Sequence, residues 1–142
     1  MEVEPQIIEK YVASGQVKIV YRHLLQLGQD SERAAEASEC AGEQGKFWEM
    51  RSALYNGQGD LFSSGSLDGA LAVFAKDLVA DEPAFQACLQ NGTFRDAVNA
   101  DFRTAQSEGV QSRPVFDING TRVVGSQPLA SFVSVIDAAL AQ

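Results

Sequence analysis

The sequence predicts an α/β fold in which a small mixed sheet carries a helical insertion. Residues 17–21, "VKIVY", form a run rich in β-branched residues, which is typical of a strand. Two further short apolar runs, 114–118 and 121–124, are joined by Asn119-Gly120 and indicate an antiparallel hairpin. The chain between the single strand and the hairpin has helical periodicity only. We therefore expect the order helix, strand, about five helices, hairpin, helix.

The composition indicates one globular chain with a substantial core. The chain has 142 residues, of which 45% are hydrophobic, and a formal net charge of -8. This charge disfavours nucleic acid and anionic membranes as partners, because either would require a basic surface. No stretch reaches the apolar length of a membrane span, and no charged-then-apolar signal peptide opens the chain.

The first element is predicted to be a helix, followed by the strand at 17–21. Gly15 is expected to end this helix, and Pro5 suits its first turn. The apolar residues of the helix recur at helical spacing: Val3, Ile7, Ile8, Tyr11 and Val12.

The helical block begins near residue 30. Asp30 or Ser31 can cap its first helix, Pro83 suits the start of a later one, and Gly92 can end that one before Thr93 caps the next. A loop, with or without a helical turn in it, is expected at 56–69. An inward-facing stripe is expected from Phe47, Met50 and Leu54, and another from Phe94, Ala97, Val98, Phe102 and Ala105.

The hairpin is the clearest local signal in the sequence. Asn119-Gly120 suits a type I′ turn, which needs a positive φ at both positions. A two-residue loop pairs Ile118 with Thr121 and, one step further, Asp117 with Arg122. We expect the last two side chains to form a cross-strand ion pair worth a few tenths to about 1 kcal/mol.

The chain closes with a predicted amphipathic helix. Pro128 suits its first turn. Its expected core-facing stripe consists of Leu129, Phe132, Val133, Ile136 and Leu140.

The remaining polar and aromatic candidates favour structural roles. His23, the only histidine, has no evident nucleophile beside it and is predicted to lie at the surface or at a strand end. Phe47 and Trp48 are predicted core residues. The acidic residues of the first insertion helix are predicted to form a solvated face: Asp30, Glu32, Glu36, Glu39 and Glu43.

The two cysteines, Cys40 and Cys88, do not suggest a catalytic pair. The sequence contains no Cys-x-x-Cys, no phosphate-binding glycine loop and no His-Glu-x-x-His, so we expect neither a cofactor nor a metal. Cys40 lies beside Glu39 and near Glu43, and negative neighbours disfavour a thiolate. Two readings remain: a disulfide between insertion helices, or two small buried core residues.

Three stretches together resemble the DsbA-like branch of the thioredoxin fold. They are "PQIIEKYVASGQVKIVYRHL" (5–24), "SECAGEQGKFWEMRSALYNGQ" (38–58) and the segment from "FQACLQNGTFRDAV" to "SFVSVIDAAL" (85–140). The resemblance covers nearly the whole chain, and it depends on the order and spacing of these stretches. It implies a thioredoxin-like part at 1–28 and 110–142, with a helical insertion at 29–109.

The resemblance also assigns roles to particular residues. Pro114 matches the cis-proline of the family, and the residue before it, Arg113, would line the substrate-binding loop. Arg113 departs from the small or β-branched residue usual at this position, which puts any inherited substrate preference in doubt. Because relatives often carry cysteines at both positions, the resemblance favours a Cys40–Cys88 disulfide. The family's first strand and Cys-x-x-Cys precede the region that matches residues 3–12.

Two function classes follow from the resemblance. The first is a DsbA-family protein-disulfide oxidoreductase seen without its catalytic Cys-x-x-Cys, inactive in dithiol exchange as given. The second is a non-catalytic thioredoxin-fold module that binds peptides or proteins. A Cys-x-x-Cys encoded in frame just upstream of Met1 would favour the first class.

The expected partners are extended polypeptides or a redox partner protein, and the family is typically exported or extracytoplasmic. In the family the first strand lies at the centre of the sheet, so both strands beside it would have open edges here. We therefore expect a homodimer that uses the N-terminal helix or a sheet edge.

Overall fold

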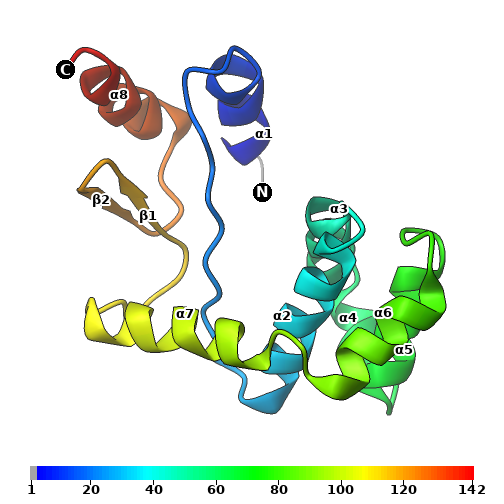
Figure 1. Ribbon diagram of the computed structural model, residues 1–142. Coiled ribbons are helices and arrows are strands. Elements are labelled where there is room, and N and C mark those ends of the chain that lie inside the picture. Colours follow the sequence, from blue (N-terminus) through cyan, green and yellow to red (C-terminus); the bar gives the residue numbers. More distant parts are fainter. Residues whose placement is uncertain (1–2) are drawn as a thin grey trace. The chain divides into compact units, whose positions relative to one another are not determined.

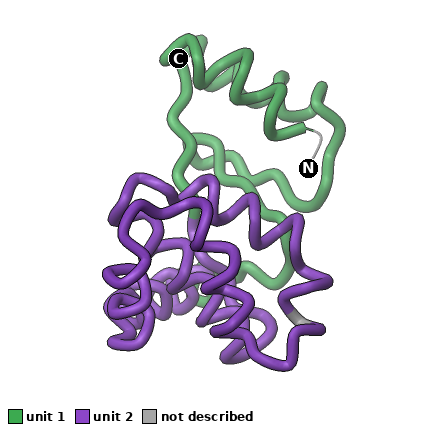
Figure 2. Tube along the Cα trace, turned by 90° about the vertical axis from the view of Figure 1, so that its right-hand side faces the viewer, with its two compact units in different colours: residues 1–21, 106–142 green, residues 22–105 purple. Residues whose placement is uncertain are grey.

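The computed structural model describes residues 3–142, with residue 62 described by its backbone alone (Figure 1). The chain divides into two compact units (Figure 2). Unit 1 combines residues 1–21 with 106–142, and unit 2 comprises residues 22–105. The sequence-based domain boundaries after residues 28 and 109 stay a prediction.

Unit 1 holds two helices against a β-hairpin. The N-terminal helix starts as α1 (Val3–Ile7) and continues as a π-helical turn, η1 (Ile8–Val12). The hairpin strands are β1 (Val115–Ile118) and β2 (Thr121–Val124), and α8 (Leu129–Leu140) follows directly after Pro128. The core of the unit consists of Ile7, Tyr11, Phe132 and Ile136, with Phe116, Ile118 and Val123 packed against it. The Tyr11 hydroxyl donates to Asp137 Oδ1 at 2.6 Å and links the two helices.

The hairpin has the predicted register and turn. Asp117 lies opposite Arg122 and Ile118 opposite Thr121, and both turn residues have positive φ, 47° at Asn119 and 89° at Gly120. The predicted Asp117–Arg122 ion pair is wrong. Asp117 Oδ1 accepts the Gly120 N–H at 2.8 Å, because its carboxylate can satisfy the turn locally.

Arg122 instead lies against the chain that leads into the hairpin. Its Nη1 donates to the Glu108 carbonyl at 2.9 Å, and its Nη2 is 3.6 Å from Glu108 Oε2. A guanidinium with five donors can reach a carbonyl and a carboxylate of one residue together, which a single cross-strand carboxylate does not offer.

The predicted strand at 17–21 is wrong, and so is the mixed sheet. In the described chain the sheet contains only β1 and β2, which are antiparallel. Residues 17–21 have no regular secondary structure, and Val17 donates its N–H back to Tyr11. β-Branched residues favour an extended backbone, but a strand exists only where a neighbouring strand accepts its hydrogen bonds.

Unit 2 is built from helices, which accords with the periodicity of its sequence. They are α2 (Gln29–Gly42), α3 (Phe47–Asn56), α4 (Gln58–Ser63), α5 (Leu67–Lys76), α6 (Glu82–Asn91) and α7 (Arg95–Ser107), whose last two residues belong to unit 1. Asp81 caps α6 by accepting the Ala84 N–H, and Gly92, at φ 59°, ends it as predicted. The predicted cap of α2 is wrong: the helix starts at Gln29 after Gly28, and the Ser31 hydroxyl accepts the Leu27 N–H.

The core of unit 2 lies between α2, α3, α4, α5 and α6. Its buried members include Ala37, Ala41, Met50, Leu61, Leu71, Ala75, Phe85 and Leu89, together with both cysteines. Small residues on α2 allow the other helices to approach closely, while Met50, Leu71 and Phe85 fill the volume.

Three residues predicted to face the core are exposed, namely Trp48, Ala97 and Leu140. Trp48 is 43% exposed, because two residues of helix separate it from buried Met50 by about 200° and so place it on the opposite side of α3. Its ring lies 5.5 Å from the Arg51 guanidinium. Leu140 is 44% exposed because it is the last residue of α8, beyond the turns that hold the buried Phe132 and Ile136.

Candidate functional site

The segment before β1 carries the two residues predicted to form a substrate-binding loop. Arg113 and Pro114 are both exposed, and the peptide bond between them is cis. The Pro114 carbonyl accepts the Gly125 N–H at 2.8 Å, so the hairpin closes one residue beyond its strands. This hydrogen bond holds Pro114 beside β2, and Arg113 lies just before the paired part of the hairpin.

The register shows which backbone groups of β1 point away from β2. In a two-residue hairpin the pair that flanks the turn, Ile118 and Thr121, is hydrogen-bonded, and such pairs then alternate along the strands. The next hydrogen-bonded pair is Phe116 with Val123, and the Gly125 to Pro114 bond continues the series. The N–H and C=O groups of Val115 and Asp117 therefore face the other edge of β1. No strand of the described chain pairs with this edge, which we call the open edge of β1.

The two faces of the hairpin also differ, because only one of them packs against α8. The Phe116 ring packs edge-on against Phe132 of α8, with 4.9 Å between the ring centroids. Because side chains alternate along a strand, Val115 and Asp117 lie on the face turned away from α8. If a strand were added at the open edge, its side chains on this outer face would lie beside Val115 and Asp117.

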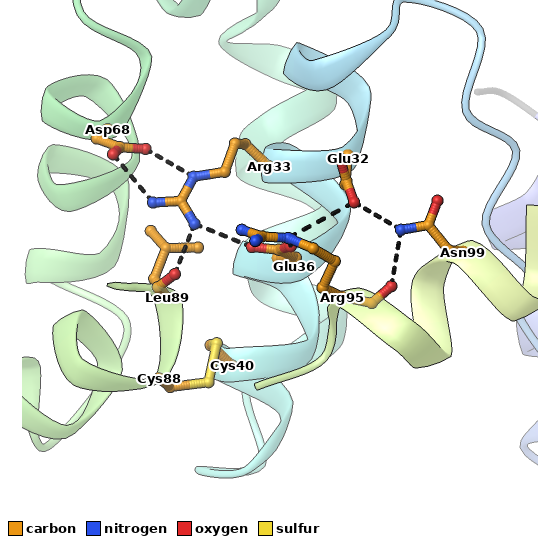
Figure 3. A network of polar contacts seen from close by, with 9 residues as sticks. All are labelled: Glu32, Arg33, Glu36, Cys40, Asp68, Cys88, Leu89, Arg95 and Asn99. Atoms are coloured by element: carbon orange, nitrogen blue, oxygen red, sulfur yellow. Dashed lines mark hydrogen bonds and ion pairs between the residues drawn. A yellow bond between two sulfur atoms is a disulfide. The ribbon is translucent and has the colours of Figure 1, made fainter. Parts of the chain in front are cut away.

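Cys40 and Cys88 form a disulfide that joins α2 to α6 inside unit 2 (Figure 3). Their Cα atoms are 5.9 Å apart, and the two residues are only 1% and 7% exposed. They are the only cysteines of the chain, so no free thiol remains. The bond is a structural element of the helical core.

Comparison with known proteins places this arrangement in a family. A family model described as Thioredoxin matches residues 1–138. The chain belongs to the DsbA-like thioredoxin family. Its fold matches the crystal structure of oxidised BdbD from Bacillus subtilis with a TM-score of 0.85 at 21% sequence identity, covering 99% of this chain and 78% of that one. The predicted thioredoxin-like fold is thereby confirmed.

Curated relatives of this DsbA-like chain are much longer proteins. The Na(+)/H(+) antiporter NhaA 1 of Salinispora arenicola and NhaA 3 of Salinispora tropica are each 30% identical to it over 142 residues. The match covers 99% of this chain and 21% of each relative, so the chain spans about a fifth of the length of the curated relatives it matches. Within residues 3–142 we find no helix long and apolar enough to cross a bilayer.

The acidic face predicted for α2 is solvated only at its ends: Asp30 and Glu43 are exposed, whereas the prediction is wrong for Glu36. Glu36 is fully buried and pairs with two arginines, Arg33 Nη1 at 2.9 Å and Arg95 Nε at 2.8 Å. Glu32 accepts a hydrogen bond from Asn99 at 2.6 Å and lies 3.6 Å from Arg95 (Figure 3). The prediction failed because α7 supplies Arg95 and Asn99 from far along the chain. The sequence did contain an indication that Glu36 is buried, since small apolar alanines flank it on both sides in "AAEAS".

Arg33 connects the buried Glu36 of α2 to the exposed side of α5. It also donates Nε and Nη2 to the two oxygens of Asp68, at 3.0 and 2.9 Å, and Nη1 to the Leu89 carbonyl of α6. The hydrogen bonds that Arg33 donates to the Asp68 carboxylate raise the pKa of Arg33 and lower the pKa of Asp68. The network thus ties α2, α5, α6 and α7 together, close to the disulfide (Figure 3).

A cavity of about 460 Å³ borders the network and is lined by Gln29, Glu32, Arg33 and Arg95. Both of its guanidinium groups are bonded to carboxylates of the same network. The cavity is accordingly part of this structural feature.

His23 is buried, not at the surface or a strand end as predicted. Its Nε2 lies 2.7 Å from Glu39 Oε1, and its backbone N–H donates to Asp101 Oδ2 at 3.1 Å. Arg22 donates to the other oxygen of Asp101. These contacts anchor residues 22 and 23 to α2 and α7, a structural role that the sequence indicated only by the lack of a nucleophile.

Proposed function

We propose that this chain is the polypeptide-binding part of a DsbA-like module, in which the open edge of β1 accepts an extended segment of another protein. The observation that carries the proposal is the direction of the Val115 and Asp117 peptide groups, which point away from β2. A peptide that adds as a strand gains main-chain hydrogen bonds there whatever its side chains. Membership of the DsbA-like family supports a protein as the bound species.

The proposal assigns Arg113 and Pro114 to the substrate-binding loop. Both are exposed and directly precede the first outward peptide group of β1. The Pro114 carbonyl is already bonded to Gly125, so this residue sets the end of the edge. Arg113 precedes Pro114 and is therefore the next residue beyond this end of the edge.

Peptide binding tests the proposal. Extended peptides of about eight residues, carrying a fluorophore, would be titrated with the protein and followed by fluorescence anisotropy. Replacing Val115 with proline removes an outward N–H, and Val124→Pro removes an outward N–H from the opposite edge of the hairpin, because the two residues form a pair that is not hydrogen-bonded. Of these two variants, we expect only Val115→Pro to weaken peptide binding, and Val124→Pro serves as its control.

The peptide provides a control that does not depend on how the variants fold. N-methylation at alternate residues removes either the peptide N–H groups that face β1 or those that face solvent. Strand addition predicts that one methylation pattern abolishes binding and the other leaves it intact. Equal effects of the two patterns would refute strand addition.

The second part of the proposal is that this chain does not catalyse dithiol exchange. Its two sulfur atoms are bonded to one another within a packed core, whereas exchange requires an accessible thiolate beside a resolving thiol. We expect insulin reduction with dithiothreitol to proceed at the rate without protein. Turnover clearly above that background would contradict this part.

A homodimer is a further candidate for the same surface, because an open strand edge can also pair with a second copy of the chain. Light scattering on a size-exclusion column at micromolar concentration tests it. A mass of one chain would exclude the dimer.

A further inference from the structure

The dipeptide Asn-Gly occurs three times in the chain, and the structure places the three copies in different surroundings. Asn56-Gly57 and Asn91-Gly92 lie where α3 and α6 end, and Asn119-Gly120 forms the turn of the hairpin. All three asparagines are exposed, but of the three glycines only Gly120 is exposed. This difference matters chemically, because an Asn-Gly dipeptide can cyclise.

The reaction takes place between an asparagine side chain and the peptide nitrogen that follows it. The nitrogen loses its proton and attacks the side-chain carbonyl carbon. The bond from that carbon to the side-chain nitrogen breaks, and ammonia leaves with the proton. Water then opens the cyclic imide at one of its two carbonyl groups, which gives aspartate or isoaspartate, and nothing is oxidised or reduced. Glycine favours the attack because it has no Cβ to hinder it.

At the two helix ends the backbone holds the attacking nitrogen. The Gly57 N–H donates to the Ala53 carbonyl at 2.8 Å. The Gly92 N–H donates to the Leu89 carbonyl at 3.2 Å. Space is limited beside Gly57, where an added Cβ would lie 2.4 Å from the Phe74 ring. Turning either asparagine toward the following nitrogen unwinds the last turn of a helix that packs in the core of unit 2.

In the hairpin turn a single exposed side chain holds the attacking nitrogen. The Gly120 N–H donates to Asp117 Oδ1 at 2.8 Å, and Asp117 is itself exposed. No atom lies within 4 Å of a Cβ built on Gly120, so the turn has open space on that side. An exposed carboxylate rotates away more readily than a helix end unwinds, because local opening is easiest where few packed contacts have to break.

We propose that Asn119 is the modification site of the folded chain, and that Asp117 slows its conversion to aspartate and isoaspartate. The carboxylate of Asp117 slows the reaction in two ways. Its hydrogen bond must break before the Gly120 nitrogen can attack, and its negative charge opposes the loss of the N–H proton. The reaction needs only water, so this modification and peptide binding are tested independently of each other.

The modification changes the hairpin in two respects. Each conversion replaces a neutral amide with a carboxylate and so adds one negative charge to a chain whose formal net charge is -8. Isoaspartate also inserts an additional carbon atom into the backbone of a two-residue turn, and the register of β1 with β2 depends on the length of that turn. We therefore expect the isoaspartate form to lose the native register.

Storage of the folded chain at neutral pH, followed by peptide mapping with mass spectrometry, tests the assignment of the site. We expect Asn119 to be converted about tenfold faster than Asn56 or Asn91, because its surroundings open more easily. In concentrated urea, where the chain is unfolded, the three Asn-Gly dipeptides should react at similar rates. This control separates the effect of the structure from that of the dipeptide itself.

Three variants test the role of Asp117. Asp117→Ala should accelerate the conversion of Asn119 about tenfold, because a hydrogen bond to a charged acceptor is lost. Arg122→Ala is the matched control and should leave the rate nearly unchanged, because Arg122 lies opposite Asp117 but its side chain bonds to Glu108. Asn119→Gly should abolish the reaction at this position, and glycine still permits the positive φ of the turn.

Each part of the proposal can fail separately. If Asn56 or Asn91 reacts as fast as Asn119 in the folded chain, the assignment of the site is wrong. The same holds if the unfolded chain reacts at all three positions while the folded chain reacts at none. If Asp117→Ala slows the conversion or leaves its rate unchanged, the protective role of the carboxylate is wrong.

Discussion

Replacing Glu36 with glutamine tests whether the buried network stabilises unit 2. The substitution keeps the shape of the side chain and removes its charge, so it creates no cavity. Glu36 is fully buried and accepts hydrogen bonds from Arg33 and Arg95. In the variant the amide oxygen can accept only from one arginine, while the amide NH2 faces the other donor.

The expected loss of stability depends on which partners Arg33 and Arg95 retain once the charge of Glu36 is removed. Removing the charge from a buried ion pair typically costs about 3–5 kcal/mol, because the partner charge is left unpaired. Here Arg33 keeps both bonds to Asp68, and the Arg95 side chain is 51% exposed and can turn to water. We therefore expect the free energy of unfolding to fall by the smaller amount of about 2–3 kcal/mol.

Urea unfolding measures this loss, followed by circular dichroism and by the emission of Trp48, the only tryptophan. With a denaturant slope of about 2 kcal/mol per molar, the midpoint should fall by about 1–1.5 M. The matched control is Asp68→Asn, which removes the other partner of Arg33 at a position whose side chain is 61% exposed. An exposed ion pair contributes about 0–1 kcal/mol, so the control should lose much less.

The comparison of the two variants decides the question. If Glu36→Gln loses no more than Asp68→Asn, burial does not strengthen the network, and the reasoning from the exposed fractions is wrong.

Three further predictions concern the disulfide, the turn and the acid range. Replacing both cysteines with alanine should lower the free energy of unfolding by about 4 kcal/mol, because the bond closes a loop with a sequence separation of 48; an unchanged melting temperature would contradict this. Gly120→Ala should cost about 1–2 kcal/mol in urea unfolding, because φ is 89° there although no atom lies within 4 Å of the added Cβ, whereas Asn119→Gly should cost almost nothing. The hydrogen bond from Arg33 lowers the folded-state pKa of Asp68, so its contribution is present above the unfolded pKa of about 4 and is lost as the pH falls through the folded value. The stability difference between the native chain and Asp68→Asn should accordingly be constant above about pH 5 and shrink below pH 4 in acid titrations of stability.

The features predicted correctly from the sequence are those that neighbouring residues decide. The hairpin register follows from Asn119-Gly120, because few residues other than asparagine and glycine tolerate positive φ at both turn positions. Gly92 ends α6 for the same backbone reason. The order of these local signals along the chain was enough to indicate the DsbA-like family.

The features decided only by tertiary structure depend on partners far along the chain. The charge pattern of the α2 sequence predicts that Glu36 is solvated. In the structure Glu36 is buried, and Arg95 of α7, 59 residues further along the chain, donates a hydrogen bond to it. His23 is buried by Glu39 and Asp101 in the same way. Residues 17–21 have the composition of a strand, but composition supplies only an extended preference, and the hydrogen bonds that make a strand must come from another segment. The sequence thus determined local backbone geometry, whereas burial, ion pairing and strand pairing were decided by contacts between distant segments, whose free energy no local pattern contains.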